Sequence, residues 1–174
     1  MRKFTYGQLE IRRLSITDLA WIFIYLTLVL VTIILDRDNY VKEHYGTLFM
    51  TAAAVGFLTF QTQLGLRFRS VYFSCIWLII SFYIVDNEFT IMYYPLSVFL
   101  LYHIIRIVFW NKYEREFIPF IWNRGWKRSS FSRRVNNIEN SGGSVKDLDF
   151  TRWLVGLSLV IFFICLWGMI GVKI

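Results

Sequence analysis

The sequence predicts an all-α integral membrane protein with five transmembrane helices and a basic loop between the fourth and the fifth helix. Three observations predict this class. Hydrophobic residues make up 56% of the 174 residues and charged residues 18%, whereas a soluble domain has roughly 45–50% and about 25%. Five apolar runs approach the ~20 residues that cross a bilayer, and they lack the alternation of a barrel strand. Lys and Arg residues gather on one side of these runs.

The first four runs form the region 19–110. Each is expected to be helical because lipid cannot hydrogen bond to open backbone groups. Ser15 and Asp18 form a capping box before the first run, at the end of a tail of residues 1–18. Only two residues separate the third run from the fourth, which predicts a tight hairpin or a re-entrant pair. The four runs are 19–35, 45–63, 70–86 and 89–110.

One sizeable polar segment, 111–151, follows the fourth run. Its first part, 111–128, mixes charged and aromatic residues, and this composition predicts a segment that lies in the membrane interface. Residues 129–149 are rich in Ser and Asn and predict a flexible loop.

The fifth helix is predicted over 152–172. It belongs to the C-terminal region 152–174, which ends in a short tail after the span. Asp149 and Thr151 are candidate N-caps for this helix, since their side-chain oxygens can accept hydrogen bonds from its first backbone N–H groups.

The distribution of Lys and Arg predicts the orientation of the chain. Sixteen of the nineteen fall on the side that holds the N-terminal tail, the link 64–69 and the stretch between the last two spans. Because these residues stay on the cytoplasmic side, we expect a cytoplasmic N-terminus and an outer C-terminus. The bias also accounts for the net charge of +7, so specific nucleic-acid binding is not expected. The Ile- and Phe-rich composition is typical of small bacterial inner-membrane proteins, which predicts that location.

A basic run inside the polar segment is the candidate surface for lipid or for a partner. Cationic side chains beside a span attract anionic headgroups or an acidic partner, and Trp favours the headgroup level. The alternative is that the run only fixes the orientation of the span. No RNA-binding motif accompanies the charge. The residues are Arg124, Trp126, Lys127, Arg128, Arg133 and Arg134.

A second candidate is a polar cluster inside the spans, formed by Thr59, Gln61, Gln63, His103 and Arg106. His103 and Arg106 share one helical face, and ionisable groups inside a membrane often mark a site, such as a proton relay or a haem ligand. The alternative for both is hydrogen bonding between helices, with the Arg106 head reaching the headgroups. The Thr59, Gln61 and Gln63 side chains either hydrogen bond to neighbouring helices or line a pore.

Ala52 and Gly56, four residues apart, form a small-residue stripe. Such a stripe lets another helix approach closely, either from the same chain or from a second copy.

The sequence predicts no metal, cofactor or catalytic residue. Two His and two Cys disfavour a structural zinc site, and Walker, dinucleotide-binding and His-Glu-x-x-His motifs are absent. We therefore expect a non-catalytic subunit or accessory protein of a larger membrane complex, with the lipid bilayer and other membrane subunits or its own copies as partners. One alternative is a homo-oligomeric channel, favoured by the polar second span and the acidic turn 86–88. The other is a lipid or small-molecule enzyme or transporter, favoured by His103 and Arg106.

Overall fold

The computed structural model describes residues 9–11, 13–37, 45–59, 62–85, 90–114, 117, 119 and 145–171. Within these ranges the chain forms helices and one isolated β-bridge, so the all-α prediction is confirmed for the part that is described. In chain order the elements are α1 (Ile16–Arg37), α3 (Tyr45–Thr59), α4 (Thr62–Gly65), the 3₁₀ helix η1 (Leu66–Arg69), α5 (Val71–Val85), the 3₁₀ helix η2 (Thr90–Met92), α6 (Tyr93–Tyr113) and α8 (Val145–Gly171).

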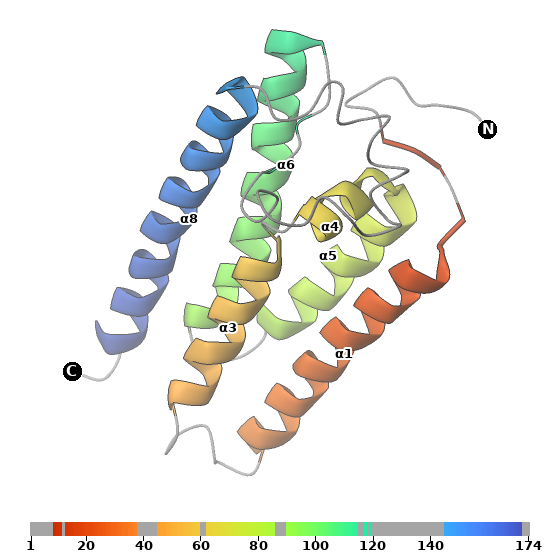
Figure 1. The fold of residues 1–174 in the computed structure, drawn as a ribbon. Helices are drawn as coiled ribbons and strands as arrows, with labels where there is room; N and C mark the ends of the chain where they lie inside the picture. The colour runs from red at the N-terminus through yellow and green to blue at the C-terminus, as the bar shows by residue number, and fades with distance from the viewer. Residues whose placement is uncertain are drawn as a thin grey trace, which may run out of the picture.

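Figure 1 shows α6 and α8 side by side on one flank, α1 on the opposite flank, and α3, α4 and α5 between them. The helix α6 is central, because it packs against α8, α3 and α5. On the other flank α1 packs against α5, where the Tyr25 ring stacks on Trp77 with centroids 4.0 Å apart. The Tyr25 hydroxyl also lies 2.9 Å from the Ser81 hydroxyl. Aromatic contacts thus join α1 to the rest of the bundle.

The start of α1 follows the predicted capping box. The Ser15 N–H donates to the Asp18 carboxylate at 2.9 Å, and the Asp18 N–H donates to the Ser15 hydroxyl at 3.2 Å. This reciprocal pair satisfies two backbone donors that the first turn of a helix leaves open. The prediction of this cap is confirmed.

The start of α8 differs from the prediction. This helix begins at Val145, so Asp149 and Thr151 lie inside it and are not N-caps. The Thr151 hydroxyl donates instead to the Asp147 carbonyl at 2.7 Å, one turn back. Hydropathy marks where the apolar part of a helix begins, and this helix starts about two turns before residue 152.

Among the described residues three helices are long and apolar enough to cross a membrane, over Ile16–Ile34, Thr90–Tyr113 and Lys146–Gly168. They suggest a membrane protein. In contrast α3 and α5 have 15 residues each, so each rises about 22 Å, less than the ~30 Å of a hydrocarbon core. The described residues form five helices of 15 residues or more, and three of these meet the length of a span. Within the predicted runs 45–63 and 70–86, the described helices α3 and α5 are thus shorter than a span, and the turn at 62–70 between them lies inside the bundle.

Candidate functional site

The turn between α3 and α5, residues 62–70, holds the buried polar side chains of Arg67 and Ser70, and we call it the buried connection. Leu64, Phe68 and Ser70 are fully buried in it. The prediction treats its residues 64–69 as an exposed link, because it contains two arginines between apolar runs. A short helix and a 3₁₀ turn leave backbone groups that water cannot reach here, so other side chains must supply their hydrogen bonds.

Side chains from α5 and α6 supply donors to the buried connection. The Tyr102 hydroxyl donates to the Gly65 carbonyl at 2.9 Å. Two donors converge on the Phe68 carbonyl: Arg106 Nη1 at 3.2 Å and the Ser74 hydroxyl at 2.8 Å. Arg106 is only 3% exposed, so its head turns into the bundle and not out towards headgroups. Of the two expectations for Arg106, the structure shows hydrogen bonding between helices.

A buried ion pair joins the buried connection to α1. The Arg67 guanidinium contacts the Asp18 carboxylate, with side-chain exposures of 7% and 0%. Arg67 Nη1 also donates to the Thr17 hydroxyl at 3.0 Å. Asp18 therefore does two things, because the same carboxylate closes the capping box of α1 and balances the charge of Arg67.

The segment before α1 runs alongside the same connection. Glu10 forms a parallel β-bridge with Ser70. The Glu10 N–H donates to the Arg69 carbonyl at 2.7 Å, and the Val71 N–H donates to the Glu10 carbonyl at 3.2 Å. The side chains add a partly exposed ion pair, 3.1 Å between Arg69 Nη2 and Glu10 Oε1. Backbone hydrogen bonds and an ion pair thus connect the N-terminal segment to the junction of η1 and α5.

His103 stands one turn from Arg106 among aromatic rings. Its ring lies 4.6 Å from that of Phe99 and 5.9 Å from that of Phe68, centroid to centroid. The Nε2 atom is buried and has no hydrogen-bond partner among the residues that the structure describes. Among the described residues no three His, Cys, Asp or Glu side chains gather where they could hold a metal ion. The arrangement gives His103 a packing role and offers a haem or metal no second ligand within this part of the chain.

Of the other predicted members of the polar cluster, the structure describes the side chain of Thr59. Thr59 is fully buried and its hydroxyl donates to the Val55 carbonyl at 2.9 Å, one turn back on α3. Gln61 and the side chain of Gln63 lie outside the described residues. The hydroxyl of Thr59 is therefore used inside its own helix.

The small-residue stripe has its partner inside the chain. Ala52 is buried, and a Cβ atom at Gly56 would lie 2.2 Å from Cε1 of Tyr94 on α6. The missing side chain of Gly56 is what lets the Tyr94 ring reach α3. Of the two partners that the sequence leaves open, α6 of the same chain occupies this face.

Two predicted surfaces cannot be placed. The six residues of the basic run lie outside the described residues, as does the acidic turn 86–88. Six residues from the first part of the polar segment are described: residues 111–113 continue α6, Glu114 caps it, and Phe117 and Pro119 are buried. The Phe117 ring lies 5.4 Å from that of Phe109, so this part of the predicted interfacial segment packs on the bundle.

The sequence predicts neither the pairing of Asp18 with Arg67 nor the contribution of Tyr102 to the same site. The available signal is an acidic residue in the first turn of an apolar helix and an arginine flanked by Leu66 and Phe68. A charge in such surroundings needs a partner, but the pattern does not say which one.

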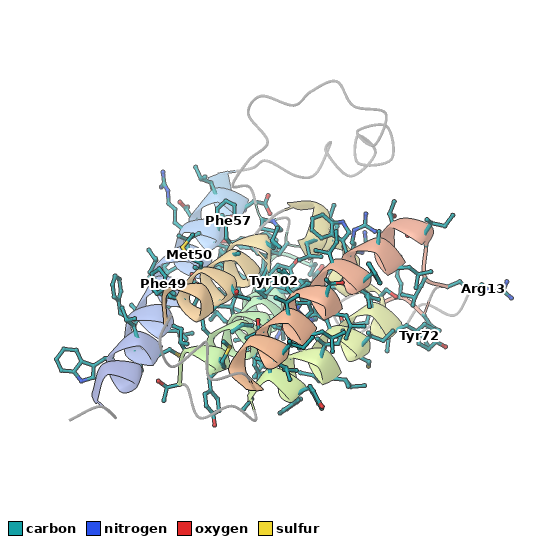
Figure 2. The ribbon with its side chains drawn as sticks, turned by 90° about the horizontal axis from the view of Figure 1, so that it is seen from below. Arg13, Phe49, Met50, Phe57, Tyr72 and Tyr102 are labelled. Carbon is teal, nitrogen blue, oxygen red and sulfur yellow. The ribbon has the colours of Figure 1, made fainter. Side chains whose placement is uncertain are left out.

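Replacing Tyr102 with Phe should lower the free energy of unfolding by about 1–3 kcal/mol, because the Gly65 carbonyl loses a buried donor. The measurement is the unfolding of detergent-purified protein, followed by Trp fluorescence. Tyr72→Phe is the matched control, because Figure 2 places Tyr72 at the edge of the bundle, where it is 52% exposed, and Tyr102 between the helices. Equal effects of the two substitutions would contradict the role of the Tyr102 hydroxyl.

Comparison of the chain with known protein families, with curated proteins and with solved structures finds no significant match. The described part of the chain is an all-helical protein with three helices long and apolar enough to cross a membrane.

Proposed function

We propose that this chain is a polytopic membrane protein that acts as a non-catalytic subunit or accessory protein of a larger membrane complex. The buried polar groups support a structural role. Tyr102, Arg106 and Ser74 are bonded to backbone carbonyls of the buried connection, and Arg67 is paired with Asp18. These groups hold the fold together, and none of these bonds leaves a group arranged for chemistry on a substrate.

The rest of the chain covers only a small part of α1 and α8, and the proposal depends on this observation. Only 22% of the most apolar stretch of each is buried, against 50% for α6. Large apolar side chains such as Phe23 on α1 and Trp167 on α8 are 69% and 80% exposed. The two helices form opposite flanks of the bundle (Figure 1). Two separate apolar flanks suit a protein that contacts lipid and neighbouring membrane subunits at once.

The channel alternative gains no support from these observations. Thr59 and the Ala52–Gly56 stripe, which favour a pore or a contact between copies, are both used within the chain. His103, which favours an enzyme or transporter, is packed among rings. The basic run stays a proposed docking segment.

The test is the composition of the complex that a tagged chain forms in its native membrane, purified in mild detergent and weighed by native mass spectrometry. We expect other membrane proteins at a fixed stoichiometry. The pair Phe23→Ala with Ile34→Ala tests the α1 flank, and Phe163→Ala with Trp167→Ala tests the α8 flank, since all four side chains are exposed. At least one pair should release a partner. A particle that contains copies of this chain alone would contradict the proposal and favour the channel.

A further inference from the structure

The end of the bundle where α6 stops and α8 starts carries two lysines around one tyrosine. The Lys112 and Lys146 ammonium nitrogens lie 5.5 and 4.7 Å from the centre of the Tyr113 ring. Both lysines are exposed and Tyr113 is half-buried. Tyr113 ends one candidate span and Lys146 begins another. If these helices cross the bilayer, the three side chains lie at headgroup level, where amphipathic aromatic rings and lysines are favoured.

Aromatic packing fixes this arrangement. The Tyr113 ring lies 4.8 Å from that of Phe109 on α6 and 5.9 Å from that of Phe150 on α8. Phe109 and Phe150 meet edge to face at 5.0 Å. The two lysines come from different helices, yet their distances to one ring keep the ammonium nitrogens within about 10 Å of each other. A phosphate group beside this ring is attracted by both cations.

A shallow depression continues from this end along the outer face of α8. Its volume is about 570 Å³, and among the described residues α8 alone supplies its lining. Asp149, Arg152 and Trp153 line it near the polar end, and Leu157 and Val160 line it further along the helix. Gly156 opens its middle, since a Cβ atom there would meet nothing within 4 Å. The helical spacing of Lys146, Trp153 and Val160 places all three on one face of α8.

We propose that this face binds one anionic phospholipid. Its phosphate lies between Lys112 and Lys146 beside Tyr113, and one acyl chain follows the depression over Gly156. The surface is complementary to such a lipid, because it is cationic at the level of the anionic headgroup and apolar along the acyl chain. Two acidic side chains are also exposed at this end, Glu114 and Asp149, and Asp149 is 3.4 Å from Arg152. The inference rests on the proposal that the chain lies in a membrane.

The experiment measures retained lipid by native mass spectrometry of the full chain. Phosphatidylglycerol and phosphatidylcholine with the same acyl chains are added to the detergent-purified protein. We expect one phosphatidylglycerol to remain bound when phosphatidylcholine is lost. The double variant Lys112→Gln with Lys146→Gln should lower this retention roughly ten- to thirtyfold. Arg13→Gln is the matched control, because Figure 2 shows this exposed cation at the far side of the molecule from α8.

A second variant separates a bound lipid from general charge attraction. Gly156→Phe fills the depression and leaves every charge in place, so it should lower retention while the protein stays folded. Excess glycerol 3-phosphate should leave the lipid bound. Equal retention of the two lipids, an equal loss in Arg13→Gln, unchanged retention in Gly156→Phe, or displacement by glycerol 3-phosphate would each overturn the proposal.

Discussion

Replacing Arg67 with methionine should destabilise the folded chain by about 3–5 kcal/mol. Methionine has a similar length, but it removes the cation that balances the Asp18 carboxylate, and Asp18 is completely buried. A charge that is left buried without a partner costs much more free energy than the removal of both charges of the pair. We expect a value near the lower limit, because the Ser15 N–H still donates to Asp18.

The measurement is the free energy of unfolding in detergent, with Arg152→Met as the matched control. Arg152 also pairs with an aspartate, Asp149, but both side chains are more than half exposed, so its loss should cost about 1 kcal/mol or less. Adding Asp18→Asn to Arg67→Met should restore part of the stability, because neither charge is then buried alone. If the double variant is less stable than Arg67→Met, the carboxylate is not the source of the cost.

The same ion pair shows where sequence reasoning reached its limit. The capping box could be predicted because Ser15 and Asp18 are three residues apart and their contact is local. The partner of Asp18 could not, because Arg67 is 49 residues further along the chain. Counting Lys and Arg residues assigns Arg67 to a loop, because the count uses the charge of Arg67 and contains no information on Asp18. Without that partner the turn at 64–69 could only be predicted as exposed.

The small-residue stripe of Ala52 and Gly56 could also be predicted only in part. Ala52 and Gly56 indicate that some group approaches α3 closely, and the structure has such a group. Its identity is set by the way α6 crosses α3, which places Tyr94 opposite Gly56. Residue spacing within one helix carries no information on that crossing. The Arg106 side chain is a parallel case, because its burial depends on the Phe68 carbonyl, which only the fold brings within 3.2 Å.

Replacing Gly56 with leucine should cost at least about 3 kcal/mol and reduce the amount of folded protein. Even the first added atom would lie 2.2 Å from Cε1 and 2.8 Å from Cζ of Tyr94. The ring of Tyr94 has little room to move, because it is 4% exposed and packs against Phe162 of α8 at 4.9 Å. The substitution therefore forces α3 away from α6, which is the central helix of the bundle. Thermal unfolding in detergent and the yield of monodisperse protein measure the effect.

Gly156→Leu is the control that separates packing from the conformational freedom of glycine. Both glycines lie inside helices, but a Cβ atom at Gly156 would have nothing within 4 Å, so this control should leave stability unchanged or raise it by up to about 1 kcal/mol. The double variant Gly56→Leu with Tyr94→Ala should regain part of the loss, because removing the ring opens the space that the leucine needs. If Gly56→Leu behaves like Gly156→Leu, the face of α3 at Gly56 is open, and the contact between copies that the sequence leaves possible becomes the better explanation for the stripe.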